Sequence, residues 1–379
     1  MEHMEIIFLL LIGIVFYCWV VYPLMLKLLS VFYAKGIKKE DCSPHVTVLL
    51  TVFNEEKVIR NRIENLLALQ YPGDKLDILV ASDGSTDKTH DIVKEFDSKG
   101  VQLFVASQRK GKSITQNEAV SLAHSDILVF TDADTVFDTR WLEKIVRPFA
   151  DPSVGCVSGQ LLLRKRDNSI SESQGVYYKY ETALRMLESK IGILSTAIGP
   201  CMAIRRKLFK PLDGQYGDDC IIPLDIISQG YRVIHEPEAI ANDIFPSSIH
   251  GELKTRIRMT LRNWTGTLSR KHLLNPFKYP FISFSLISHR ILRWLTPYLL
   301  LLIFIANLLL LENPWFFALF LLQVIFYVLS FIGFFLEKKA IHLRVFTVPF
   351  SFCLANLGMF LGVLKCFFGY KIITYRADK

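Results

Sequence analysis

The stretch Asp126-Ile127-Leu128-Val129-Phe130-Thr131-Asp132-Ala133-Asp134 decides the fold class of this chain. Four apolar residues in succession, 127–130, are typical of a buried strand in a parallel sheet. Two carboxylates follow at once, and alternate residues of an extended chain face the same side. Asp132 and Asp134 would repel each other unless a cation lay between them, and their hard oxygen ligands suit Mg²⁺ or Mn²⁺. We interpret Asp132 and Asp134 as a binding site for a metal ion and a diphosphate. The alternative is a polar turn that closes a strand.

Composition indicates a soluble domain flanked by membrane segments. The chain has 379 residues, enough for about two domains. It is 51% hydrophobic and 21% charged, with a mean hydropathy of +0.31. The net charge of +8 favours anionic lipid headgroups and phosphorylated substrates over nucleic acid, because the chain has no nucleic-acid-binding signature or compact basic tract. The seven cysteines follow no regular spacing, so we expect neither a disulfide framework nor a zinc site.

An almost continuous apolar stretch, residues 6–26, is long enough to cross a hydrocarbon core of about 30 Å. It lacks the basic start and small-residue cleavage site of a signal peptide, so we expect an uncleaved anchor within residues 1–35. Two acids, Glu2 and Glu5, precede it. Four lysines follow it: Lys27, Lys35, Lys38 and Lys39. By the positive-inside tendency, the domain that follows is cytosolic.

Residues 43–165 alternate between strand and helix patterns. Strands are expected at 46–53, 76–81, 101–105 and 127–130. This alternation predicts a parallel sheet wound with right-handed crossovers, whose ligands bind at the carboxyl ends of the strands. Polar clusters stand at three of those ends: Asn54/Glu55, Asp83 and Asp132/Asp134. We therefore expect these side chains to lie around one site.

The residues resemble the family 2 glycosyltransferases with the α/β, Rossmann-like GT-A fold, specifically the membrane-integrated group that includes cellulose and hyaluronan synthases. The resemblance covers roughly residues 43–270, where motif order and spacing match together, and it implies a GT-A domain at 43–248. Five segments carry it: VTVLLTVFNEEKV at 46–58, LVASDGSTDKT at 79–89, Arg109–Lys112 followed by Asn117, Asp132–Asp134, and YGDDCIIPLDIISQGYRV at 216–233.

The resemblance implies a role for each polar cluster on the donor side. It implies that Asp83 contacts the nucleotide, with Glu55 nearby. It also implies that Asp132 and Asp134 hold the metal and the diphosphate, and that Lys112 meets phosphate.

The resemblance further implies that Asp219, the last acid of Gly217-Asp218-Asp219, is the general base, with Asp218 as its catalytic neighbour. A divalent ion neutralises the departing diphosphate, and a carboxylate takes the proton of the attacking hydroxyl. One base and one metal-bound leaving group describe a single displacement that inverts the anomeric carbon. Asp219 begins a helix-like run ending at Gln229-Gly230, where a helix N-terminus favours a carboxylate. The alternative for the two acids is an N-cap pair.

Two later segments each have two interpretations. In the resemblance, residues 195–207 approach the acceptor; otherwise they are a loop, a strand and a basic helix start. Residues 249–271 are amphipathic and suit a membrane interface. Processive relatives carry Gln-x-x-Arg-Trp here, whereas this chain lacks the Gln and reads Arg262-Asn263-Trp264, which leaves processivity open. Arg262 suits the diphosphate and Trp264 a sugar ring, unless Trp264 is only an interfacial anchor.

After interfacial helices at 249–280, the sequence predicts a membrane region at 281–370 and a basic tail at 371–379. Apolar runs lie at roughly 291–311, 315–336 and 345–368. If the last run spans, the tail ends outside, against the positive-inside tendency. Either that run is re-entrant, or 281–311 holds more than one segment.

These observations predict an inverting, Mg²⁺- or Mn²⁺-dependent glycosyltransferase on the cytosolic face of the cell membrane. It would move a sugar from a nucleotide donor, UDP-linked by expectation, in β linkage to a polysaccharide or lipid acceptor. Membrane lipids and accessory export subunits are the expected partners, and nucleic acid is not. The alternative function is that of a catalytically inactive sugar-binding or assembly subunit.

Overall fold

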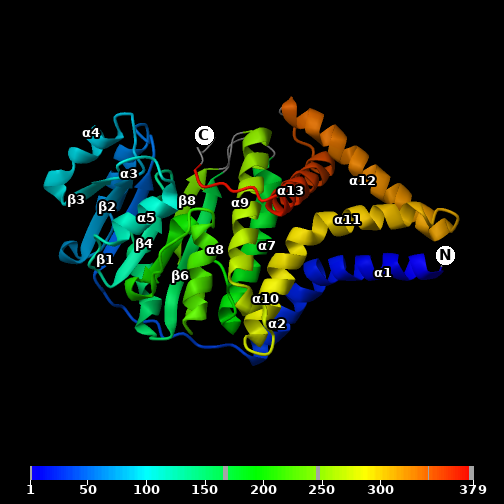
Figure 1. The fold of residues 1–379 in the computed structure, drawn as a ribbon, viewed down its shortest axis with the longest axis horizontal. Helices are drawn as coiled ribbons and strands as arrows, with labels where there is room; N and C mark the ends of the chain where they lie inside the picture. Colours follow the sequence, from blue (N-terminus) through cyan, green and yellow to red (C-terminus); the bar gives the residue numbers. More distant parts are fainter. Residues whose placement is uncertain (1, 165–169, 245–247, 340, 375–379) are drawn as a thin grey trace.

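A mixed sheet forms the centre of the larger half of the molecule (Figure 1). The computed structural model describes residues 2–164, 170–244, 248–339 and 341–374. Within them the strand order is β3-β2-β1-β4-β7-β6-β8-β5. The strands are β1 Val46–Val52, β2 Leu76–Ser82, β3 Val101–Val105, β4 Ile127–Thr131, β5 Val136–Phe137, β6 Val154–Arg164, β7 Met202–Arg205 and β8 Arg232–Ile244.

The predicted parallel arrangement is confirmed for one half of this sheet. β1 pairs in parallel with β2 and β4, and β2 pairs in parallel with β3. The other half is mixed, because β7 runs antiparallel to both β4 and β6. In this register Phe130, near the end of β4, is opposite Met202, the first residue of β7. The turn Gly199–Cys201 that precedes β7 therefore lies at the edge where β4 ends.

Helices cover both faces of the sheet because its central strands are apolar on both sides. In β4, Val129 packs into one buried cluster and its neighbours Leu128 and Phe130 into the other. The first cluster takes side chains from three helices, α3 Ile59–Leu67, α4 Thr89–Lys94 and α6 Trp141–Val146. The second takes them from α5 Lys112–Val120 and α8 Asp218–Ser228.

Within the described residues, four helices are long and apolar enough to cross a membrane: Glu2–Phe32, Pro280–Leu308, Pro314–Lys338 and Arg344–Phe367. The first comprises α1 Glu2–Phe16, a π-helical turn at Tyr17–Val21 and α2 Tyr22–Phe32. The second comprises α10 Pro280–Ser285, a π-helical turn at Leu286–Ile291 and α11 Leu292–Leu308. The others are α12 Pro314–Lys338 and α13 Arg344–Phe367. They coincide with the anchor and the apolar runs expected from the sequence.

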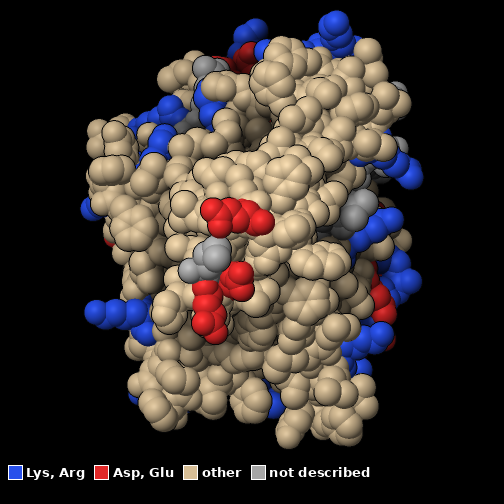
Figure 2. Space-filling view, turned by 90° about the vertical axis from the view of Figure 1, so that its right-hand side faces the viewer, with Lys and Arg blue, Asp and Glu red and all other residues tan. Residues whose placement is uncertain are grey.

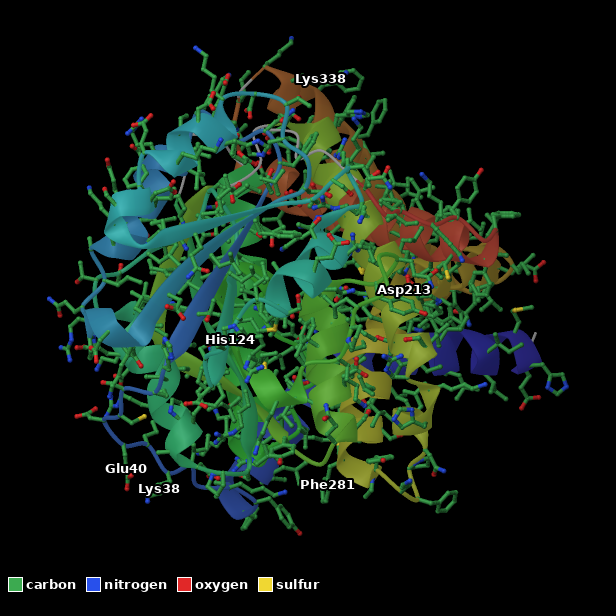
Figure 3. All side chains as sticks on the ribbon, turned by 60° about the vertical axis from the view of Figure 1, so that its left-hand side comes forward. Lys38, Glu40, His124, Asp213, Phe281 and Lys338 are labelled. Carbon is green, nitrogen blue, oxygen red and sulfur yellow. The ribbon has the colours of Figure 1, made fainter. Side chains whose placement is uncertain are left out.

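The membrane helices project from the sheet domain. α1 and α11 lie side by side, joined by a buried cluster around Phe8 and Ile303 (Figure 1). Seen end-on in Figure 2, this face is largely uncharged, with acidic groups near its centre and Lys and Arg toward its margins. Such a surface suits contact with lipid, since few charged groups would have to leave water. In Figure 3, Lys338 at the end of α12 lies at the upper edge of the molecule, and Phe281 in α10 lies at the lower edge.

α13 packs along the amphipathic helix α9, Ile249–Ser269, instead of projecting alone. A Cβ at Gly358 would lie 2.6 Å from Arg256 Cβ, and one at Gly362 would lie 2.7 Å from Thr260 Cβ, so glycine permits the close approach. The chain after α13 then returns to the sheet domain, where Ile373 O lies 2.6 Å from the position of a Cβ on Gly111. The described part of the tail is therefore on the side of the sheet domain, as both the re-entrant interpretation of 345–368 and a second segment within 281–311 require. The rest of the predicted tail lies outside the described residues.

Candidate active site

The loops after β1 and β2 interlock through hydrogen bonds at the carboxyl edge of the sheet. Asn54 has a positive φ of 55°, and its amide nitrogen donates to Ser85 Oγ at 3.0 Å. Its side-chain oxygen accepts from the Thr86 amide at 2.7 Å. The Glu55 amide donates to Thr89 Oγ1 at 2.9 Å. The backbone of the predicted Asn54/Glu55 cluster is thus fixed against the loop that carries Asp83.

Asp83 is only 4% exposed and holds the start of α5. Its carboxylate accepts hydrogen bonds from the Lys110 amide at 2.7 Å, the Gly111 amide at 3.0 Å and Thr115 Oγ1 at 2.9 Å. Gly111 has φ +91°, which an L side chain rarely adopts. By fixing the backbone of Lys110 and Gly111, Asp83 orients Lys112, the residue after Gly111. Its predicted contact with a nucleotide stays a prediction.

Lys112 joins two acidic motifs that lie far apart in the sequence. Its Nζ lies 2.8 Å from Asp132 Oδ1 and 3.0 Å from Asp218 Oδ2. Gln116 Nε2, one turn along α5, donates to Asp218 Oδ2 at 3.3 Å. Burial alone would raise the pKa of Asp218, but the positive charges of Lys112 and Arg262 outweigh it and lower that pKa to about 2. Asp218 is therefore a carboxylate at neutral pH.

Asp219 stands beside this cluster in the first turn of α8. Burial and the negative charge of Asp218 raise the pKa of Asp219, while the charge of Arg290 acts in the opposite direction. Its side chain has no hydrogen bond or ion pair with another described residue. Its carbonyl oxygen accepts from the Ala197 amide at 3.1 Å, and a Cβ on Gly199 would lie 3.6 Å from Asp219 Cβ.

The segment 195–207 therefore combines both of its interpretations. Its first part lies against Asp219, as the acceptor interpretation requires. Its basic part is structural, because Arg205 donates to the carbonyls of Val154 and Phe149 and Arg206 donates to that of Ser125.

Helix α9 places Arg262 of the altered Arg–Trp motif within electrostatic range of Asp218, while Trp264 packs against Trp294 of the second membrane segment. Arg262 is 6% exposed, and its Nη2 donates to Ser113 Oγ at 3.2 Å and to the Tyr216 carbonyl. Trp264 is 7% exposed and packs edge-to-face on Trp294, with ring centroids 5.8 Å apart. A buried indole does not fit the alternative of an anchor among lipid headgroups, where one end of the ring stays wet.

The buried arginine behind the Asp132 loop was missed by sequence reasoning. Arg62 is 2% exposed; its Nη2 donates to Thr131 Oγ1 at 2.7 Å and its Nε to the Asp132 carbonyl at 3.3 Å. Its guanidinium also lies 4.2 Å from the centroid of the Phe137 ring. The available signal was a charged residue on the apolar face of a helix, between Ile59 and Ile63. Gln116 was missed as well, because the residues around it in the sequence give no comparable signal.

The donor atoms at this site fit a divalent ion shared with a diphosphate. No group of three or more His, Cys, Asp or Glu side chains in the described ranges is placed to hold a metal. The side chain of Asp132 is 35% exposed and offers hard oxygen, and Asp134 follows it by two residues. Mg²⁺ and Mn²⁺ are commonly bound by one or two carboxylates plus phosphate oxygens and water, so this set suffices.

Comparisons with known proteins find similarity to glycosyltransferases. Residues 47–212 match the model of Glycosyl transferase family 2. An N-acetylglucosaminyltransferase of Azorhizobium caulinodans is 28% identical over 244 residues, covering 59% of this chain and 61% of the relative. A poly-beta-1,6-N-acetyl-D-glucosamine synthase of Staphylococcus aureus is 26% identical over 242 residues, covering 60% and 58%. The chain thus spans about three fifths of the length of these curated relatives.

Among solved structures, the chain is similar to the mannosyltransferase PcManGT from Pyrobaculum calidifontis in complex with GDP-Man and Mn²⁺. The TM-score is 0.75 at 22% identity, over 97% of this chain and 100% of that one. At this identity the likeness shows the fold, and it extends over the membrane helices as well as the sheet domain. Residues 47–212 are therefore similar to glycosyltransferase family 2 domains and have a mixed α/β fold of the GT-A kind, and the described residues add four helices able to cross a membrane.

Proposed function

We propose that this chain is an inverting glycosyltransferase that moves a sugar from a nucleotide donor to a membrane-associated acceptor. The observation that carries the proposal is the bridge made by Lys112 between Asp132 and Asp218, with Asp219 beside it. These residues come from three separate segments of the chain. Purely structural roles for Asp132 and Asp218 would not require both carboxylates to share the ammonium group of Lys112.

The chemistry of the transfer follows from this arrangement. The acceptor hydroxyl oxygen forms a bond to the anomeric carbon, its proton passes to Asp219, and the bond from that carbon to the diphosphate breaks. The leaving nucleoside diphosphate takes the electron pair. A divalent ion held by Asp132 and Asp134, when bound, supplies positive charge to that leaving group. Lys112 and Arg262 add fixed positive charge on the same side, which stabilises the developing negative charge.

The donor sugar is proposed from the relatives. Their names point to N-acetylglucosaminyl transfer, which supports a UDP-linked donor, whereas the solved neighbour was bound to GDP-Man. We propose UDP-N-acetylglucosamine as the first donor to test. The domain is proposed to face the cytosol, where nucleotide sugars occur and where the lysines after the first span predict it to lie.

The test uses the full chain in membranes or proteoliposomes with Mn²⁺, a panel of UDP- and GDP-sugars, and sizing of the labelled product. We expect UDP release that requires the metal and is abolished by EDTA. Asp219→Asn should abolish transfer but leave donor binding within about twofold of the wild type, because the amide keeps the shape and loses the base. Near-normal turnover in this variant would remove Asp219 from the base role. A wild-type chain that turns over no donor would instead favour the inactive assembly subunit.

A further inference from the structure

A buried arginine stands where the second membrane segment meets the sheet domain. Arg290 belongs to the π-helical turn Leu286–Ile291 and is 8% exposed. Its Nη2 is buried and has no hydrogen-bond partner, and the described part of the chain offers Arg290 no ion pair. A buried charge without such partners is costly, so an arginine here is best explained by a group that the chain itself does not supply.

The surroundings of Arg290 place it on the acceptor side of the site. Its charge lowers the pKa of Asp219 against the effects of burial and of Asp218, so the guanidinium lies within electrostatic range of the proposed base. Its guanidinium carbon lies 5.7 Å from the centroid of the Trp294 ring, which packs against Trp264 at 5.8 Å. An arginine, two indoles and a carboxylate thus lie together at the start of the membrane segment.

A structural charge pair with Glu188 is the competing explanation. The charge of Arg290 does lower the pKa of Glu188, but no hydrogen bond or ion pair joins the two. Glu188 Oε1 already has three partners: Tyr22 Oη at 2.6 Å, His289 Nδ1 at 2.7 Å and Ser285 Oγ at 3.1 Å. Glu188 Oε2 and Arg290 Nη2 are both buried without a hydrogen-bond partner among the described residues, so the two groups do not satisfy each other. Arg293, almost one turn further on, shows what a structural arginine looks like here, because it is paired with Glu181 and lies over the Trp19 ring.

We propose that Arg290 binds a phosphate group of the acceptor and that the acceptor is a lipid-linked sugar phosphate. This inference rests on the proposed function and names the substrate class of the same site. A planar guanidinium pairs with phosphate in a bidentate manner, and such charged hydrogen bonds are strong away from water. The segment that carries Arg290 continues into an apolar span, so the lipid chain has a surface to follow. The sugar would present its hydroxyl to Asp219 while Trp294 and Trp264 contact its ring or the first lipid carbons.

The experiment compares two acceptors that differ only in the phosphate. One is N-acetylglucosamine linked through phosphate to farnesyl, and the other is farnesyl β-N-acetylglucosaminide, which has none. A third arm, soluble N-acetylglucosamine 1-phosphate, separates lipid-bound from free phosphate. We expect the wild type in proteoliposomes to prefer the farnesyl phosphate acceptor. Arg290→Gln should lower kcat/KM for it at least about tenfold, chiefly through KM, because one charge-assisted bond is lost.

Two readouts separate binding from a merely structural role. In Arg290→Gln the ratio of kcat/KM for the phosphate acceptor to that for the neutral acceptor should fall at least about tenfold, and Arg290→Lys should restore part of this preference. The matched control, Arg293→Gln, should lower thermal stability and both acceptor activities together, because Glu181 then keeps only its contact with His289 among the described residues. Equal losses on both acceptors in Arg290→Gln, or a wild-type preference for the neutral or soluble acceptor, would overturn the assignment. If the wild type turned over no donor at all, the proposed function would fail first.

Discussion

Replacing Lys112 by methionine tests whether the two acidic motifs are held together by one ammonium group. The Nζ lies 2.8 Å from Asp132 and 3.0 Å from Asp218, and the Asp218 side chain is only 12% exposed. The pKa of Asp218 falls from its ordinary value of 3.8 to about 2, although burial alone would raise it. At 1.36 kcal/mol for each tenfold change in proton affinity, this corresponds to roughly 2–3 kcal/mol. Because Lys112 contributes more than Arg262, we expect the variant to lose about 2 kcal/mol of stability at neutral pH.

The loss should depend on pH in a defined direction. A carboxyl whose pKa is depressed on folding contributes stability that is complete above its unfolded pKa, here near 3.8, and is lost as pH falls toward 2. The difference between wild type and Lys112→Met should therefore be largest near neutrality and shrink below about pH 4. The raised pKa of Asp219 means that its charged form destabilises the folded protein at neutral pH, because burial and the charge of Asp218 both disfavour it. The double variant Lys112→Met/Asp218→Asn should therefore recover part of the stability that Lys112→Met loses.

Thermal unfolding in detergent with EDTA measures this effect without a metal at Asp132. A loss of about 2 kcal/mol should lower Tm by roughly 4–8 °C for a domain of this size. The matched control is Lys110→Met, whose ion pair with Glu118 at 2.7 Å has side chains 29% and 35% exposed. An exposed pair of this kind contributes about 0–1 kcal/mol, so its Tm should change little. Equal shifts in the two variants would refute the reasoning.

The acid limb of the pH profile of kcat should lie at a higher pH than the ordinary pKa range of an aspartate, because burial and Asp218 raise the pKa of Asp219. Asp218→Asn should move that limb to lower pH. An unmoved limb in an active variant would contradict the electrostatic coupling of the two acids. Gly362→Ala should destabilise the packing of α13 on α9 by about 1–3 kcal/mol, because its Cβ would lie 2.7 Å from Thr260 Cβ. Gly13→Ala is the control for thermal unfolding, since nothing lies within 4 Å of its Cβ, and a similar Tm loss there would show that the contact is not the cause.

The sequence alone predicted the elements whose pattern is local. Buried strands read as apolar runs, and the ends of β1, β2 and β4 could be located because a polar cluster follows each. Parallel pairing then placed Asp83 and Asp132 at one edge without further information. The apolar helices were equally legible, because crossing a membrane imposes a length and a composition on consecutive residues.

The tertiary structure decided what depends on contacts between distant segments. The sequence spacing of Lys112, Asp132 and Asp218 does not reveal that the Lys112 ammonium group pairs with both acids. β7 and α8 reach the site only after a change of strand direction. The role of Arg62 beneath the Asp132 loop and the return of α13 along α9 likewise depend on packing. Arg290 is one basic residue at the start of an apolar run by sequence, and only burial beside Asp219 distinguishes it from a cation that reaches water. Side-chain burial and long-range charge pairing arise from the folded arrangement, so local pattern carries no record of them.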